Sequence, residues 1–265
     1  MKFLTAVANA LLVANVALAT PLSAGKQEAI RALRARSSAR QSNRYQGNYD
    51  TQIINGTAAV TSSNWGGVAL VTSGVTEVTG TFTVPKPTKP SGGSSSTQYC
   101  GAAWVGIDGY SDSDLIQTGV LWCVQGTTYL YEAWYEYLPA SLVAYSGITV
   151  TSGSVVTVTA VKTGTNSGTT SLTSGGKTVT HTFTGQSSPL PGTSAEWIVE
   201  DFESNGALVP FANFGTVTFT GASALVNGVT ETPGGNSGTI IILEQSNTAL
   251  TSTTVSGSTV TVVYE

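Results

Sequence analysis

The feature that most constrains the fold is a succession of short runs of β-branched and aromatic residues between positions 65 and 264. Gly, Ser, Asn or Pro separates one run from the next, which is typical of β-strands joined by turns. Apolar and polar residues alternate in 155–161 and again in 259–262, as they do in strands with one buried face. No run keeps a helical period. The pattern predicts an all-β protein, a sandwich or jelly roll of antiparallel strands.

One β domain is expected over residues 56–265, because sandwiches often exceed 200 residues as single domains. A run rich in Pro, Ser and Gly at 85–98 is expected to be a surface loop, since strand patterning resumes on both sides of it. The expected strands lie at 75–84, 102–107, 115–124, 128–138, 154–161, 178–183, 195–202, 216–219, 239–243 and 259–264.

The first 19 residues have a different character from the rest of the chain. Lys2 precedes an apolar run at 4–18, and the segment ends in the small-x-small sequence Ala17-Leu18-Ala19. This order is typical of a secretory signal peptide, and the apolar run is short for a membrane span. We therefore expect a secreted, extracellular protein without a membrane anchor.

Residues 20–55, here called the amino-terminal segment, are basic. Residues 1–50 hold seven basic and two acidic side chains, whereas 51–265 hold four Lys, no Arg and thirteen acids, so the net charges are +5 and −9. A solvated basic tail is one interpretation. Nucleic-acid binding is disfavoured, since no aromatic residue precedes Tyr45 within the segment. We favour a removable pro-segment that lies on the acidic domain as an intramolecular inhibitor and is released when acid neutralises the carboxylates. The one glycosylation sequon, at Asn55, falls at its boundary.

Cysteine and histidine are scarce. Cys100 and Cys123 form an even pair, for which a disulfide is the default in a secreted protein. One His and two Cys exclude a His-rich metal cage and a tetrathiolate zinc site, and we expect no metal and no cofactor. A catalytic thiol would need His181 as its base, on an unrelated polar run, and is disfavoured.

Two stretches concentrate the acids of the domain. The period-2 geometry of a strand places Glu132, Trp134 and Glu136 on one face, and Glu196 and Glu200 share a face of another strand. Acids set among aromatic side chains are desolvated, which raises their pKa and suits them to acid–base chemistry. For Glu196 an outward, solvated position is equally compatible with the pattern.

Residue types alone leave three functions open. Lectin-like sandwiches that cleave glucans carry paired carboxylates on a Trp-lined concave face, and the stretch at 132–136 loosely meets that description. Sugar cleavage, sugar binding and proteolysis are all compatible with these features. Serine and aspartic peptidases are disfavoured, since the sequence contains neither their fold pattern nor an Asp-Thr-Gly or Asp-Ser-Gly motif.

Several motifs together resemble the glutamic peptidases, or eqolisin family, of filamentous fungi. They occur in order at 63–67 (SNWGG), 103–109 (AWVGIDG), 115–119 (LIQTG), 133–136 (AWYE), 195–203 (AEWIVEDFE) and 209–212 (VPFA). The similarity runs through nearly all of 60–265, and the signal with a basic segment resembles the family's precursor layout. It implies a sandwich of two antiparallel seven-stranded sheets with a cleft on the concave face, endopeptidase activity at acidic pH, and protein or peptide substrates.

The resemblance also implies site residues. The catalytic Gln and Glu of the family match Gln117 and Glu200. Cleft residues of the family match Trp65, Trp104, Asp108, Trp134 and Glu136, and we expect Trp104, Asp108 and Glu136 to fix Gln117. The family typically carries Trp-Tyr-Pro after this Glu, whereas here Leu138 stands at the Tyr position, which puts the substrate preference in doubt.

The implied chemistry suits these residue types. A Glu200 carboxylate can take a proton from a water that attacks a peptide carbonyl and return it to the leaving nitrogen. The Gln117 amide offers two donors for an oxyanion and a carbonyl that can hold the water. The acidic domain has few ion pairs to lose on acidification, so its stability should persist or improve as the pH falls toward about 4. We expect a monomer.

Overall fold

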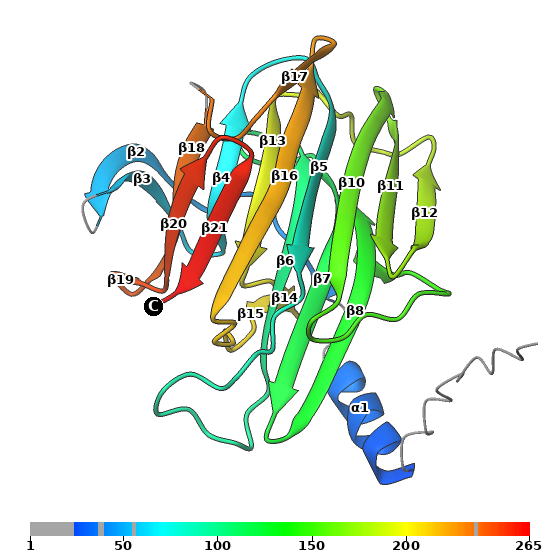
Figure 1. Cartoon of the computed structure of the whole chain (residues 1–265), viewed down its shortest axis with the longest axis vertical. Coiled ribbons are helices and arrows are strands. Elements are labelled where there is room, and N and C mark those ends of the chain that lie inside the picture. Colours follow the sequence, from blue (N-terminus) through cyan, green and yellow to red (C-terminus); the bar gives the residue numbers. More distant parts are fainter. Residues whose placement is uncertain (1–23, 37–39, 55–56, 236–237) are drawn as a thin grey trace, which may run out of the picture.

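The computed structural model describes residues 24–36, 40–54, 57–235 and 238–265. The predicted signal peptide (1–19) and Asn55 of the sequon lie outside the described residues. Two large sheets face each other, which confirms the predicted β-sandwich (Figure 1). None of the helices in the described ranges is long and apolar enough to cross a membrane.

The first large sheet, called the cleft sheet, carries the candidate site. Its strand order is β2-β3-β18-β4-β13-β6-β7-β8-β9, and β19 pairs with β18. The bounds along the chain are β2 (Gly47–Ile54), β3 (Thr57–Ser62), β4 (Trp65–Val71), β6 (Tyr99–Ile107), β7 (Ile116–Gln125), β8 (Thr128–Tyr137), β9 (Val143–Ala144), β13 (Ser194–Glu200), β18 (Gly238–Gln245) and β19 (Thr248–Ala249).

The second large sheet, called the back sheet, has the order β12-β11-β10-β5-β16-β21-β20, and β17 pairs with β16. Its bounds are β5 (Val75–Thr83), β10 (Val155–Gly164), β11 (Ser167–Ser174), β12 (Lys177–Phe183), β16 (Thr216–Val226), β17 (Val229–Glu231), β20 (Thr251–Ser256) and β21 (Thr259–Tyr264). A small sheet joins β1 (Arg40–Gln41), β14 (Glu203–Ser204) and β15 (Ala207–Leu208), and the helix α1 (Ala24–Arg36) lies against β8.

The strand count refines the expectation of seven strands per sheet. The back sheet has a path of seven strands with β17 added, and the cleft sheet has seven from β3 to β8 with β2, β9 and β19 added. The pairing of β3 with β18 is parallel, so the cleft sheet is not purely antiparallel. Every predicted strand is present, although β16 extends seven residues beyond the predicted end at 219. Of the strands of six or more residues, β2, β3, β4 and the polar strands β11 and β20 were not predicted.

The cleft sheet is apolar on both faces. Trp197 and Val199 pack in the core between the sheets, while Ile198 between them belongs to a second apolar cluster on the opposite face. Trp104 belongs to this second cluster as well. Each face of the cleft sheet is covered by its own apolar layer, and all described residues of β6 and β13 are therefore buried. The second layer holds the candidate site.

The predicted disulfide is confirmed. Cys100 on β6 and Cys123 on β7 are directly opposite each other in the ladder and are bonded. The helix α1 was not predicted. Its Ala, Gln, Glu and Arg residues favour a helix once it can pack on another element, but the sequence gives no sign of that partner.

Candidate active site

Gln117 and Glu136 form the first half of the site. They are directly opposite each other on β7 and β8, and both side chains are fully buried. The Gln117 amide Nε2 donates to Glu136 Oε2 at 2.8 Å. The other amide atom, Gln117 Oε1, is buried and has no hydrogen-bond partner among the described residues. One carboxyl group therefore orients the amide and leaves its carbonyl available as an acceptor.

Glu200 forms the second half, at the carboxyl end of β13. The indole Nε1 of Trp104 donates to Glu200 Oε2 at 2.8 Å. Trp65 packs edge-on against Trp104 with ring centroids 5.0 Å apart, and both rings are fully buried. The position of the carboxyl group is thus fixed by a donor that is itself held in an aromatic stack.

A peptide backbone from the amino-terminal segment lies across both halves. The backbone N–H of Ser42 donates to Glu136 Oε2 at 3.2 Å, and that of Asn43 donates to Glu200 Oε1 at 2.9 Å. The carbonyl oxygen of Asn43 accepts from Trp65 Nε1 at 2.9 Å. Two successive amides therefore bridge the carboxyl groups of Glu136 and Glu200, which brings the predicted site residues together around one stretch of chain.

Upstream of Ser42 the segment is anchored by charge and by strand pairing. Arg34 and Arg40 both form ion pairs with Glu132, whose side chain is only 5% exposed. Arg40 and Gln41 form β1, which pairs antiparallel with β14. Glu132 shares a face of β8 with Glu136, as predicted, so the cation site and the candidate catalytic site belong to one surface.

The two carboxyl groups of the site are strongly perturbed. Burial raises the pKa of Glu136 well above its ordinary value, and the neighbouring charge of Glu200 raises it further. Burial also raises the pKa of Glu200, to about 7, against the opposing effect of hydrogen bonds from Asn43 and Trp104. When two buried carboxyl groups interact, the charge of one disfavours ionisation of the other. One group can then keep its proton while the other acts as a base.

The remaining predicted cleft residues are placed differently. Trp134 is fully buried in the same apolar cluster as Trp65, Trp104 and Leu138, beneath the site. Asp108 does not contact Gln117. Its carboxylate accepts from the backbone N–H of Gly192 at 2.9 Å and from Thr193, so it ties the start of β13 to the end of β6.

Sequence reasoning missed four participants, the backbone amides of Ser42 and Asn43 and the side chains of Arg34 and Arg40. Ser42 and Asn43 contribute backbone amides, which leave no mark in a sequence because every residue other than Pro has one. Glu132 was noticed as an acid on the right face, but its partners Arg34 and Arg40 are about a hundred positions away. The opposite net charges of the two regions were the available signal, and they indicated an association without naming the pair.

Comparisons with known proteins agree with this geometry. The model of the peptidase A4 family matches residues 63–264. The chain is 41% identical to aspergillopepsin-2 of Aspergillus niger and 37% identical to scytalidopepsin B of Scytalidium lignicola, in both cases over 100% of each sequence. The chain belongs to the peptidase A4 family.

A solved structure of the family supports the fold. Scytalido-glutamic peptidase, crystallised with a transition state analog inhibitor, matches with a TM-score of 0.69 and 36% identity, covering 77% of this chain and 98% of its own. The peptidase A4 match begins at Ser63, after the amides of Ser42 and Asn43. The conserved domain therefore contains Gln117, Glu136 and Glu200, while the backbone that covers them lies outside it.

Proposed function

We propose that the protein is the precursor of a secreted endopeptidase that acts at acidic pH, with Gln117 and Glu200 as the catalytic pair. The observation that carries this proposal is the peptide backbone of residues 42–43 lying on the carboxyl groups of Glu136 and Glu200. A cleft that holds an extended chain of its own against buried acids is suited to holding a substrate chain in the same place. Membership of the peptidase A4 family supports the same conclusion.

The proposed reaction adds water to a peptide carbonyl. The Glu200 carboxylate takes a proton from water, whose oxygen forms a bond to the carbonyl carbon, and Gln117 Oε1 holds that water in position. The amide NH₂ of Gln117, anchored on Glu136, donates to the oxyanion of the tetrahedral intermediate. Glu200 then gives its proton to the leaving nitrogen as the C–N bond breaks, which restores the carboxylate.

The pKa of Glu200 must fall for this chemistry to run in acid. Its largest cause of elevation is burial, and part of that burial comes from residues 42–43. When these residues leave, water enters the cleft and the pKa moves back toward the ordinary value of a carboxyl group, about 4.3. A carboxylate is then available at acidic pH.

The amino-terminal segment is proposed to be an inhibitory pro-segment. It presents backbone N–H groups to Glu136 and Glu200, so it occupies the carboxylate oxygens that the reaction would use. The curated relatives match over the whole of this chain, whereas the crystallised scytalido-glutamic peptidase covers 77% of it. That difference supports removal of the amino-terminal quarter during maturation, near the predicted boundary at 55, which lies between β2 and β3.

Secretion and organisation complete the proposal. Residues 1–19 are proposed to direct export as a signal peptide, and residues 56–265 to form the mature domain. Substrates are proteins or peptides, and the mature enzyme is proposed to act as a monomer.

The test compares four forms of the precursor. Wild type, Glu200→Gln, Gln117→Ala and Glu203→Gln are expressed, acidified and assayed for digestion of denatured haemoglobin. We expect wild type and Glu203→Gln, whose side chain is only half-buried, to digest the protein, and the other two variants to lose the activity. Equal digestion by Glu200→Gln and wild type would overturn the assignment.

The same proteins distinguish the alternative functions. A glucan hydrolase of this fold would release sugars and leave haemoglobin intact, and Gln117→Ala would matter little to it. A carbohydrate-binding protein would keep its ligand affinity in Glu200→Gln. The Trp-lined face is compatible with both, but neither accounts for the peptide backbone that the cleft holds.

A further inference from the structure

The face of the cleft sheet that carries Gln117 extends well beyond the catalytic pair. Gln117 and Gln125 are eight positions apart on β7, and an even separation places both side chains on one face of the strand. At about 3.4 Å per residue the two positions are about 27 Å apart. An extended substrate that follows this direction therefore spans several residues beyond the bond that is cut.

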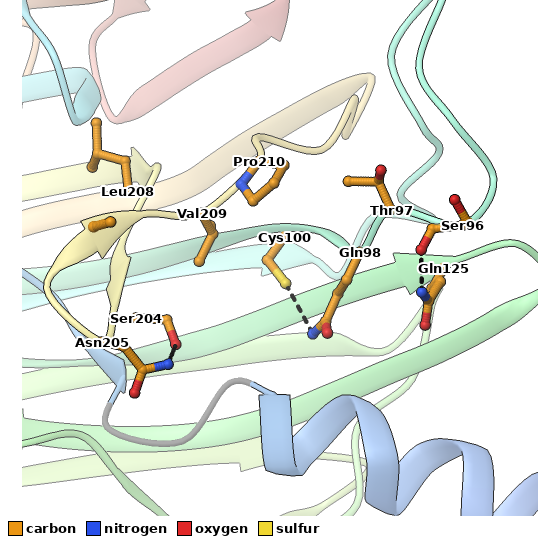
Figure 2. A pocket seen from close by; sticks show the side chains of 11 residues that line it. Ser96, Thr97, Gln98, Cys100, Gln125, Ser204, Asn205, Leu208, Val209 and Pro210 are labelled. Carbon is orange, nitrogen blue, oxygen red and sulfur yellow. Dashed lines mark hydrogen bonds between the residues drawn. The ribbon is translucent and has the colours of Figure 1, made fainter.

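A cavity of about 310 Å³ lies at the far end of this face (Figure 2). It is bounded on one side by the loop that precedes β6, on another by the turn between β14 and β15, and on its floor by the ends of β6 and β7. No lining residue is charged. The principal ones are Ser96, Gln98, Gln125, Asn205, Leu208 and Val209.

The strand β14 leads from the catalytic pair to this cavity. In the precursor, Gln41 is opposite Glu203 and Arg40 is opposite Ser204. Because the pairing is antiparallel, the amino-terminal direction along β1 points toward Asn205, which lines the cavity. Loss of the pro-segment leaves this edge of β14 without its partner β1, and an open strand edge adds an extended peptide readily.

The geometry points to a distal substrate site on the amino-terminal side of the cut bond. We propose that substrate residues preceding this bond pair with the edge of β14, as β1 does, and that residues about five to seven positions before the bond enter the cavity. The register of β1 brings the near rim of the cavity, at Ser204 and Asn205, within about two to four positions of the bond. Cys100 lines the cavity floor and is opposite Cys123, six positions after Gln117, which sets the position of the interior. Six extended residues span about 20 Å.

The neutral lining defines the chemistry of the occupant. Amide and hydroxyl groups surround the aliphatic Leu208 and Val209, so the cavity suits an uncharged side chain with an apolar body. A charged side chain would lose hydration there without gaining an ionic partner. This site rests on the proposed peptidase function, and it makes the enzyme selective for long, extended substrates.

The test measures kcat/KM for peptides of increasing length with the mature enzyme. All peptides share one core, and uncharged extensions give three, four or seven residues before the cut bond; a matched set is extended after the bond instead. We expect kcat/KM to rise at least about tenfold between four and seven residues on the amino side, equivalent to about 1.4 kcal/mol. The matched set should gain less than about threefold.

Equal gains on the two sides, or none on the amino side, would overturn the inference while leaving the peptidase function intact. Failure to cleave any peptide, together with failure to digest haemoglobin, would instead count against the proposed function. The two failures are therefore distinguishable.

A pair of variants tests the location. Thr97 lines the cavity, whereas Ser91 lies in the same loop, is exposed, and does not line it. Thr97→Trp should fill the cavity and reduce the gain from amino-side extension to less than about threefold. Ser91→Trp should keep the tenfold gain. Retention of the gain in Thr97→Trp, with the peptide still cut at the same bond, would contradict the assigned place.

Discussion

Glu196 and Glu200 are four positions apart on the same strand, share one face of it, and are both fully buried, yet their surroundings differ. Glu200 accepts hydrogen bonds from Trp104 and Asn43 and lies where a peptide backbone passes. Neither carboxyl oxygen of Glu196 has a hydrogen-bond partner of normal geometry among the described residues. Burial raises the pKa of both, but that of Glu200 to about 7 and that of Glu196 well above its ordinary value.

The difference in surroundings distinguishes Glu200, which is suited to act as a base, from Glu196, whose proton is harder to remove. Glu196 lies near Asp108 and Asp112, whose charges further raise its pKa, so its surroundings favour the neutral form. Glu200 keeps donors that stabilise its charged form, and it contacts the backbone of Asn43, which is proposed to leave with the pro-segment. A dry environment alone therefore does not make a catalytic carboxyl group; donors and access to substrate are needed as well.

The largest effect is expected on catalytic activity, when Glu200 and Glu196 are each replaced by Gln. Glu200→Gln keeps the shape of the side chain and removes the base, so kcat/KM should fall by at least about 10⁴-fold, the upper range for a group that transfers protons. Glu196→Gln, the matched change on the same face, should stay within about threefold of wild type. The measurement is kcat/KM for one peptide at acidic pH. Similar losses in both variants would contradict the different roles of Glu200 and Glu196.

A smaller loss is expected from the Gln117 amide, which donates to Glu136. Gln117→Ala removes the oxyanion donor and the acceptor that holds water, and should lower kcat about 10²- to 10³-fold. Glu136→Gln keeps an oxygen that accepts from Gln117 Nε2 and should lose less than about tenfold, whereas Glu136→Leu removes the acceptor and should approach the Gln117→Ala value. If Glu136→Gln and Glu136→Leu proved equally impaired, Glu136 would be acting otherwise than by orienting the amide.

The next effect concerns how tightly the proposed pro-segment binds to the domain. Glu132→Gln keeps the size of the side chain but removes the charge that pairs with Arg34 and Arg40. We expect the isolated pro-segment, added back to mature enzyme, to inhibit it at least about tenfold more weakly at near-neutral pH. Added salt should weaken inhibition of wild type by screening these ion pairs, and should change the Glu132→Gln variant much less.

Glu244→Gln serves as the control for this experiment, since it removes one acid from the surface of the domain on β18, away from the two arginines. A salt response equal in Glu132→Gln and wild type would place the electrostatic contact elsewhere.

The smallest effect concerns stability. Glu196 is protonated in the folded domain and ionises in the unfolded chain above about pH 4.3, so its contribution to stability is fully present below that pH and is lost as the pH rises toward its raised folded pKa. Glu196→Gln removes this loss. We expect Tm of the mature domain to rise by about 3 °C or more at pH 7 and to be unchanged at pH 3.5.

Glu203→Gln, which alters a half-buried acid just beyond the same strand, should shift Tm little at either pH. Thermal unfolding followed by circular dichroism provides both values, and a Glu196→Gln shift of the same size at both pH values would show that packing rather than ionisation is responsible.

Much of this fold could be predicted from the local sequence pattern. Strands such as β5 and β21 were predictable because alternation records which face is buried. The same reasoning placed Glu132 with Glu136 and Glu196 with Glu200, and the pairing of Cys100 with Cys123 followed from their number. The polar strands β11 and β20 carry many Thr and Ser, so their alternation is weak and they were missed.

Long-range docking was beyond sequence reasoning. The helix α1 and the short strand β1 exist where other elements receive them, and two residues of β1 carry no periodic signal. Asp108 looked like a partner for Gln117 because both lie in recognisable motifs. Its actual acceptor role toward Gly192 and Thr193 depends on how β6 and β13 end side by side, which no motif specifies.

The most direct test of the account is a double-mutant cycle on the mature enzyme, with kcat/KM measured for Glu200→Gln, Gln117→Ala and the variant carrying both changes. If one water is activated jointly by these two groups, the losses are strongly non-additive, and the double variant is no more than about tenfold slower than Glu200→Gln alone. Losses that multiply, so that the double variant falls by the product of the single effects, would show two groups acting independently and would contradict the shared site.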